Sequence, residues 1–261
     1  MDLQDAIVLL LREGTRHYDA LQIVLSADRK TVIDIFVDAL KSEDYKARYN
    51  ALWVLREFRN ENTVELIIDH LQDENEEVRR SAASVLSSFD DIKAVKAIIS
   101  ALSDSSSDVR CGAIQSLGYF NHPNVVNALI SKLNEDDFTI RVLTMYSLAK
   151  IGNGKAVNAI ASFIYDDNID LRRIAIQTLG ELGDERAIKH LVYALRDFSC
   201  DGFSNPGTEH LVPGGFPWMC HRAAWAIEEI GTDLALKIAK EWWSSYFPDG
   251  GKFMEQKPTT S

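Results

Sequence analysis

The chain has 261 residues, of which 46% are hydrophobic, and a formal net charge of −11. The excess of acidic residues argues against nucleic acid as the main partner, because binding to phosphates depends on lysine and arginine side chains. The three cysteines, Cys111, Cys200 and Cys220, are too few and too unevenly spaced for a disulfide framework. This usage is typical of a cytoplasmic protein.

Residues 1–26 are expected to form an N-terminal capping repeat. The opening string, MDLQDAIVLLLREG, carries acids where a signal peptide is basic, and its apolar run is too short to cross a membrane. We therefore expect no membrane partner. His17 stands where later repeats carry an arginine, with Ala20 and Val24 at the apolar positions that follow.

Five arginines recur every 31 residues and define a repeated unit: Arg48, Arg79, Arg110, Arg141 and Arg172. Four residues before each stands a side chain that can cap a helix N-terminus: Asp44, Asn75, Ser106, Asp137 and Asn168. Apolar residues follow each arginine at helical spacing, as in Ala51, Leu55 and Phe58. An earlier stripe in each unit, such as Ile33, Phe36 and Leu40, predicts another helix.

Neither helix of a unit can bury its apolar stripe alone, so neighbouring units must stack. The pattern predicts an all-α fold, an α-solenoid of about seven two-helix repeats plus a terminal helix. We expect a single repeat domain over residues 1–247 and a disordered tail over residues 248–261.

The repeated unit resembles the HEAT-repeat family, in particular the short bacterial HEAT-like repeats of the phycobilisome lyase type. The resemblance includes acids six residues before the arginine position: Asp73, Asp104, Glu135, Asp166 and Asp197. It implies a right-handed α-α superhelix in which these acids and the arginines form a ladder between adjacent units. It also implies that the second helices of the units line a concave face.

The largest break in the pattern is an insertion over residues 198–217. Residues 227–231 realign with residues 179–183, which places Cys220 in the arginine position and leaves Asp197 without an arginine in its own unit. A long loop inside a compact array is often functional. We name four candidate contact residues in it and directly after it: Phe203, His210, Phe216 and Trp218. The alternative is that the loop caps the open end of the solenoid.

Function is expected where the repeat columns vary, at positions one, two and five residues past the arginine. We predict that these positions lie on the helix face opposite the core stripe. Trp, Tyr and Arg dominate binding energy at protein interfaces. The candidate contacts on this face are Tyr49, Trp53, Arg80, Gln115, Tyr146, Arg173, Gln177, His221, Arg222 and Trp225. The alternative is that the large aromatics, Trp53 and Tyr146, only fill gaps between helices.

The sequence offers no catalytic constellation. It has no nucleophile elbow, P-loop or dinucleotide fingerprint. Cys200, His210, Cys220 and His221 lack the spacing of zinc ligands. None of the six histidines is followed by glutamate, which argues against a HEAT-like di-iron hydroxylase. We therefore predict no catalytic residue, no metal and no cofactor.

Two hypotheses for the function remain. The first is a non-catalytic protein-binding scaffold or adaptor, such as an assembly factor or an immunity or inhibitor protein, whose acidity favours a basic partner. The alternative is a bilin lyase or bilin-lyase-like chaperone, and a bilin is a ligand only under this alternative. It is based on two segments, residues 47–59 and the PGGFP string before His221, that are similar to phycocyanin lyase subunits of the E type.

Overall fold

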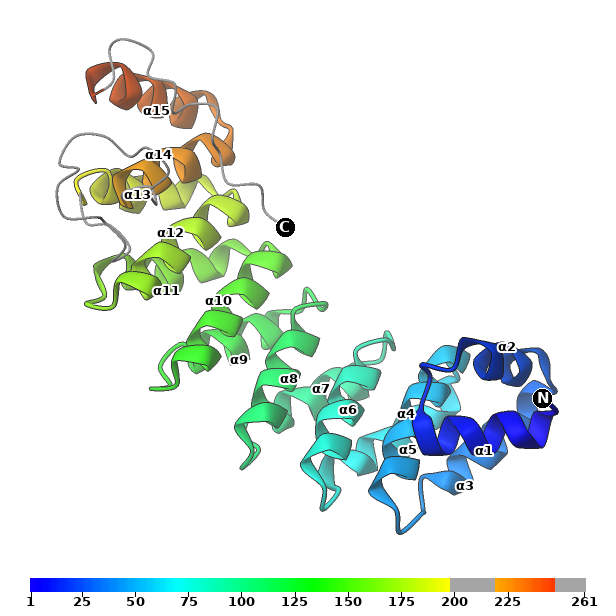
Figure 1. Cartoon of the computed structure of the whole chain (residues 1–261). Helices are drawn as coiled ribbons and strands as arrows, with labels where there is room; N and C mark the ends of the chain where they lie inside the picture. Colours follow the sequence, from blue (N-terminus) through cyan, green and yellow to red (C-terminus); the bar gives the residue numbers. More distant parts are fainter. Residues whose placement is uncertain (198–218, 247–261) are drawn as a thin grey trace, which may run out of the picture. The chain divides into compact units, whose positions relative to one another are not determined.

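The computed structural model describes residues 1–197 and 219–246, and every regular element within these ranges is a helix (Figure 1). The chain forms two compact units, Met1–Ala128 and Leu129–Ser261, and the division falls inside α9 (Pro123–Lys132). The predicted insertion over residues 198–217 and the predicted tail over residues 248–261 lie outside the described residues. The single domain over residues 1–247 stays a prediction.

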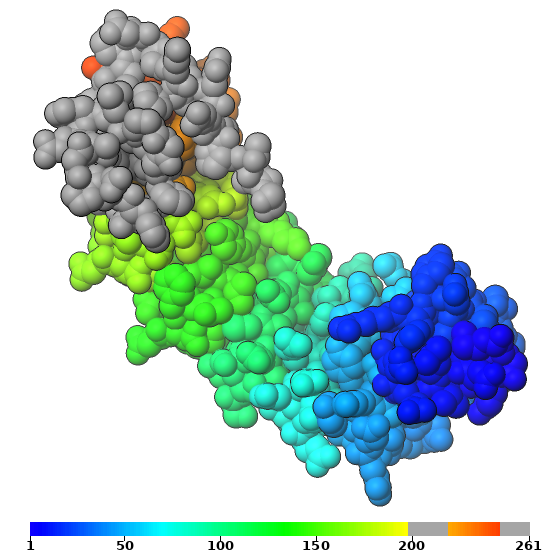
Figure 2. Space-filling view, in the orientation of Figure 1, coloured from blue at the N-terminus to red at the C-terminus, as the bar shows by residue number. Residues whose placement is uncertain are grey.

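Unit 1 is a stack of helix pairs. It opens with α1 (Leu3–Glu13) and α2 (Tyr18–Ser26). The first helices of the later pairs are α3 (Arg29–Ala39), α5 (Val64–Asp69) and α7 (Ile92–Ala101), with short 3-10 turns at Glu61–Thr63 and His70–Gln72. The second helices are α4 (Tyr45–Phe58), α6 (Glu76–Leu86) and α8 (Ser107–Leu117). Each first helix packs on its own second helix, α4 packs on α6, and α6 packs on α8. Successive pairs lie beside one another as bands of colour in Figure 2.

Unit 2 repeats this arrangement. Its second helices are α10 (Phe138–Ile151), α12 (Ile169–Leu182) and α14 (Met219–Ile230), and α12 packs against both of the others. Its first helices are α11 (Val157–Ala161) and α13 (Ile188–Ala194), with 3-10 turns at Gly154–Ala156, Ser162–Tyr165 and Glu185–Ala187. The terminal helix α15 (Asp233–Tyr246) packs on α14. The predicted all-α solenoid of two-helix repeats with a terminal helix is confirmed.

The predicted capping residues stand at the N-termini of the second helices. Asp44 accepts a hydrogen bond from the N–H of Lys46 at 3.0 Å, and Asn75, Asp137 and Asn168 cap in the same way. Ser106 occupies the equivalent place, but its hydroxyl makes no capping bond. The predicted apolar stripes form the core, since Ala51, Leu55 and Phe36 are fully buried.

The arginine–acid ladder links neighbouring helix pairs within each of the two compact units. Arg48 donates from Nε to Oδ2 of Asp73 at 2.8 Å and from Nη2 to Oδ1 at 2.7 Å. Its Nη1 donates to the carbonyl oxygens of Ser42 and Glu43, at the turn before its own helix. Arg79 with Asp104, and Arg172 with Asp197, repeat the acid contact. The Arg48 guanidinium therefore connects the turn before α4 to the acid before α6, in the next helix pair.

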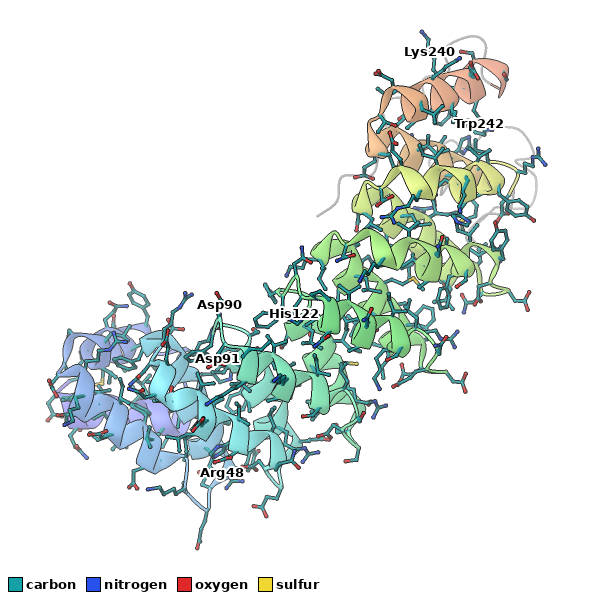
Figure 3. All side chains as sticks on the ribbon, turned by 180° about the vertical axis from the view of Figure 1, so that it is seen from behind. Arg48, Asp90, Asp91, His122, Lys240 and Trp242 are labelled. Carbon is teal, nitrogen blue, oxygen red and sulfur yellow. The ribbon has the colours of Figure 1, made fainter. Side chains whose placement is uncertain are left out.

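The ladder runs along one end of the helices. Figure 3 shows Arg48 at the opposite end of the unit 1 repeats from Asp90 and Asp91. Burial acts to raise the pKa of Asp73, but the hydrogen bonds from Arg48 and from the N–H of Asn75 outweigh it, so this pKa lies below its usual value. The ladder is broken at Arg141, which donates to the carbonyl oxygen of Asp136 and whose buried Nε has no partner within the described chain.

Asp197 has a ladder partner, although its own unit carries Cys220 in place of the arginine. In the ladder pairs described above, the acid follows its arginine by 25 residues, and Arg172 lies 3.0 Å from Asp197. In other units the arginine also donates to the carbonyl oxygen of the ladder acid, as Arg172 does to Asp166 at 2.9 Å. The backbone N–H of Cys220 takes over this bond, to the carbonyl oxygen of Asp197 at 2.9 Å. The carbonyl oxygen of Asp197 therefore keeps a hydrogen bond although the arginine is lost.

The first helix pair differs from the expected register. The helix that packs against α4 is α1, so α1 takes the place that a second helix takes elsewhere. His17 is the N-cap residue of α2 and pairs with Glu13 at 2.6 Å, outside the ladder. Ala20 and Val24 are fully buried, as expected. The degenerate unit thus brings the end of α1 and the α1–α2 loop onto the surface of α4.

Candidate functional site

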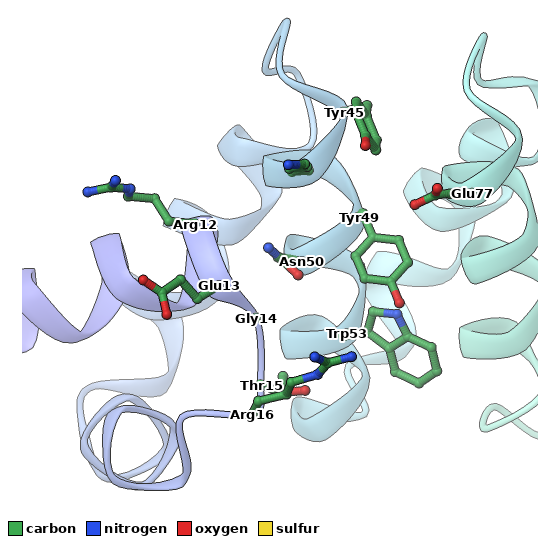
Figure 4. Close-up of a pocket in the computed structure, with 11 residues that line it drawn as sticks. Arg12, Glu13, Gly14, Thr15, Arg16, Tyr45, Tyr49, Asn50, Trp53 and Glu77 are labelled. Atoms are coloured by element: carbon green, nitrogen blue, oxygen red, sulfur yellow. The ribbon is translucent and has the colours of Figure 1, made fainter.

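The aromatic residues of α4 line a pocket in unit 1. Tyr49 and Trp53, one and five residues past the ladder arginine, form one wall together with Tyr45 (Figure 4). The end of α1 and the loop after it form the opposite wall, with Arg12 and Arg16, and Glu77 of α6 lines a further side. The volume is about 520 Å³. This is within the range of pockets that bind small molecules or side chains of a partner.

Gly14 and Asn50 fix the loop wall of this pocket. Asn50 Nδ2 donates to the carbonyl oxygen of Leu11 at 3.0 Å, at the C-terminus of α1. Gly14 ends α1 with φ = 80°, a conformation that favours glycine, and a Cβ there would lie 2.7 Å from Asn50 Oδ1. The close approach of backbone to amide therefore requires glycine. Figure 4 shows the Arg16 side chain directed toward Trp53.

Trp53 contacts two other side chains of α4 within the wall. The Arg56 guanidinium carbon lies 5.3 Å from its ring centroid, in a cation–π contact. The ring of Tyr49 lies 6.4 Å away at an angle of 56°. The Trp53 Nε1 atom is buried without a hydrogen-bond partner in the described chain. The indole is half-buried, so it both fills a gap and presents a face.

The same helix face continues along unit 1 with polar residues. Arg80 on α6 and Gln115 on α8 are both exposed. A Cβ at Gly112 would lie 2.7 Å from Cγ of Arg80. Glycine at this position of α8 therefore leaves room for the aliphatic part of the Arg80 side chain, which comes from α6. The residues two past the arginine are different, because Asn50, Ser81 and Gly112 are buried. Of the three predicted columns, those one and five past the arginine reach the surface in unit 1, and the column two past it does not.

In unit 2, the predicted residues of α10 and α12 form a polar surface. Tyr146 is 37% exposed, and burial of its remaining part raises the pKa of its phenol, with Arg173 acting in the opposite direction. Arg173 pairs with Asp170 at 3.1 Å, and Gln177 donates to Glu181 at 2.8 Å. Arg173 and Glu181 are both close enough to Tyr146 to influence the pKa of its phenol.

His221 lies inside a tryptophan cluster. It is 8% exposed, and its ring stacks on Trp243 with a centroid distance of 5.6 Å and an angle of 9°. Trp242 meets it edge-on at 5.9 Å and Trp225 lies 6.3 Å away. Burial lowers the pKa of His221, so the neutral ring is favoured. The histidine joins α14 to α15, while Trp225 and the neighbouring Arg222 remain half-buried.

The four candidate residues in and directly after the insertion, Phe203, His210, Phe216 and Trp218, lie outside the described residues. Burial raises the pKa of the Cys220 thiol to about 11, so it is protonated at neutral pH and a poor nucleophile. Over residues 1–197 and 219–246, no three His, Cys, Asp or Glu side chains come together as metal ligands. No helix of the described ranges has the length and apolar character needed to cross a membrane.

Sequence reasoning missed the loop wall of the unit 1 pocket. Arg12 and Arg16 belong to the degenerate first unit, where no repeat column identifies them. Gly14 stands between the apolar stripe of the first helix and His17, the N-cap residue of α2. This glycine was the sequence signal available for a turn. Lys46, near the start of α4, also lines the pocket.

The helix pairs and the ladder define an α-solenoid of short two-helix repeats. A family model for HEAT repeats matches residues 33–105, 95–168 and 126–199, which together span more than half of the chain. The chain belongs to the HEAT-repeat family. None of the curated proteins compared with it matches.

Solved structures share the fold at low sequence identity. An engineered protein from the Northeast Structural Genomics Consortium has a TM-score of 0.55 and 16% identity, over 97% of this chain and 69% of that one. The archaeal HEAT-like repeats protein from Thermococcus onnurineus NA1 has a TM-score of 0.52 and 17% identity, over 88% of this chain and 97% of that one. The complex of CpcE and CpcF of phycocyanin lyase from Nostoc sp. PCC7120 is similar at a TM-score of 0.47 and 16% identity, over 94% of each chain. The first two likenesses support the fold alone.

Proposed function

We propose that this protein is a non-catalytic binding scaffold that holds a protein partner on the face of its second helices, the concave face in HEAT solenoids. The pocket between α4 and the α1–α2 loop is the observation that carries this proposal. It places two aromatic side chains, Tyr49 and Trp53, beside charged groups on the variable face of the repeats. Aromatic residues of this kind are typical anchors of protein interfaces.

The proposal includes the roles of an assembly factor or an immunity or inhibitor protein, in the cytoplasm. The small number and uneven spacing of the three cysteines support that location. The net charge of −11 favours the approach of a partner of positive overall charge. Overall charge governs approach, whereas the contact itself depends on the local side chains.

The test is quantitative capture from a lysate of the native host on the immobilised protein, read by mass spectrometry. We expect a partner whose recovery falls in Trp53→Ala and in Tyr49→Ala, because loss of a hot-spot residue costs about 2 kcal/mol or more, about thirtyfold in affinity. The control is Ile92→Ala on α7, a first-helix residue that is 49% exposed. Equal recovery by all four proteins would refute a site on the second helices of unit 1.

The alternative function, a bilin lyase or bilin-lyase-like chaperone, stays a prediction. Mixing the protein with phycocyanobilin tests it directly. A shifted visible absorbance that is lost in Trp53→Ala would favour the alternative, and an unchanged spectrum would count against it.

A further inference from the structure

The pocket of unit 1 is a locally basic site on an acidic protein. Three cations line it, Arg12, Arg16 and Lys46, against two carboxylates, Glu13 and Glu77. Glu13 is already engaged by His17 at 2.6 Å. Within the described part of the chain, none of the three cations forms an ion pair. The ladder arginines Arg48 and Arg79, in contrast, are held by acids of the same chain.

The charges of the pocket act over a shorter range than the charge of the whole chain. At physiological salt the Debye length is about 8 Å, so acids farther than this from the pocket are largely screened from a group inside it. The groups that a docked segment meets are then the lining residues. Three cations against two carboxylates leave one excess positive charge in the lining, which favours a negative group.

The lining also has an apolar component. Tyr45, Tyr49 and Trp53 give aromatic surface along one wall, and the volume of about 520 Å³ accommodates more than a single carboxylate. A small inorganic anion would leave this surface in water. A peptide that carries an acidic side chain next to an aromatic or aliphatic one would use both components.

We propose that this pocket binds an acidic segment of the protein partner, with one carboxylate near Arg16, another near Lys46, and an apolar side chain against Tyr49 and Trp53. This rests on the proposed function, since it names the chemistry of the segment that the second-helix face receives. A segment of the opposite charge would place its cations among unpaired arginine and lysine side chains.

Selection from a phage library of random dodecapeptides on the immobilised full-length protein tests this inference. The most enriched peptide is then synthesised with a fluorescent label, and its affinity is measured by anisotropy. The test variant is Arg16→Glu/Lys46→Glu, and Arg16→Gln/Lys46→Gln serves as a second variant without added acids. The control is Lys30→Glu/Lys96→Glu, which reverses two exposed lysines on α3 and α7, outside the pocket. Circular dichroism checks that every variant is folded.

We expect enriched peptides rich in Asp and Glu beside aromatic or aliphatic residues. Their affinity should fall about tenfold or more in Arg16→Glu/Lys46→Glu, and less in the glutamine variant. The control should bind within about twofold of the parent. Affinity should also fall with added salt.

Three outcomes would overturn the inference: basic enriched peptides, acidic peptides that bind all variants equally, or no enrichment that depends on the pocket. The proposed function fails separately. If the native partner is lost in Trp53→Ala but no acidic peptide binds, the scaffold survives and only the chemistry of its segment is wrong.

Discussion

Arg48 and Asp73 form a buried ion pair in which both side chains are almost inaccessible, at 8% and 7% exposure. A pair of this kind need not add stability relative to an apolar pair, but removal of one partner leaves the other charge buried. We expect Arg48→Ala to lower the free energy of unfolding by about 3 kcal/mol. Urea unfolding followed by circular dichroism measures it.

The matched control is Arg141→Ala. Arg141 holds the same repeat position but donates only to the Asp136 carbonyl, and its Nε is unsatisfied in the described chain. Its removal should cost about 1 kcal/mol or less, the value of a single hydrogen bond. Equal losses in the two variants would show that the acid contact contributes nothing particular.

Asp73 also makes part of the stability depend on pH. Its pKa in the folded protein is lowered, because the bonds from Arg48 and Asn75 outweigh its burial, whereas in the unfolded chain it is about 3.9. The folded state therefore binds this proton less readily than the unfolded state does. The contribution is present above about pH 4 and is lost as the pH falls through the folded pKa.

We accordingly expect the stability difference between the parent protein and Asp73→Asn to be largest near pH 7 and to shrink below about pH 4. Urea unfolding at pH 7, 5, 4 and 3 measures this difference. A difference that stays constant down to pH 3 would mean that Asp73 titrates normally in the folded protein.

At the scale of elements, the turn after α1 shapes the pocket. Gly14 combines φ = 80° with a Cβ position 2.7 Å from Asn50 Oδ1. Gly14→Ala should therefore strain the backbone and also push the loop away from α4. We expect the two effects together to lower the free energy of unfolding by about 2–3 kcal/mol. Gly152→Ala is the control, with φ = 68° and no atom within 4 Å of the new Cβ. Gly152→Ala should lower the free energy of unfolding by about 1 kcal/mol. Equal losses in the two variants would refute the clash between residue 14 and Asn50.

The repeats could be predicted from the sequence because each contact type recurs at fixed spacing. Arg48 and Asp73, with the capping Asp44, are local signals of this kind. The buried column two past the arginine was harder to predict. A helix advances by about 100° per residue, so this position points sideways, about 100° from the core stripe, and meets the neighbouring second helix. Asn50 against α1 and Gly112 against Arg80 are examples.

The candidate site was predictable only in part. Tyr49 and Trp53 could be placed on a helix face because their column is shared by every repeat. The opposite wall, with Arg12 and Arg16, depends on the packing of α1 against α4, a non-local contact in a unit whose register has drifted. The burial of His221 likewise depends on Trp242 and Trp243, which a separate helix supplies.

At the scale of the whole molecule, the sequence has 39 acidic residues and 28 lysines and arginines, which gives the net charge of −11. Such an imbalance destabilises the compact state through self-repulsion, and salt screens it. The buried ladder pairs are shielded from salt by their burial. We therefore expect the melting temperature to rise by about 2–4 °C between 20 and 300 mM NaCl, equivalent to about 1 kcal/mol of stability, measured by scanning calorimetry.

Glu57→Gln/Glu229→Gln tests the cause of this rise. Both residues are exposed near helix C-termini, and two carboxylates become amides, so the formal net charge changes from −11 to −9. Acids at a helix C-terminus are also unfavourable toward the helix dipole. We expect this variant to melt higher than the parent at 20 mM NaCl and to gain less from added salt. A melting temperature that falls with salt in the parent would instead show that exposed pairs, such as Lys93 with Glu65, outweigh the repulsion.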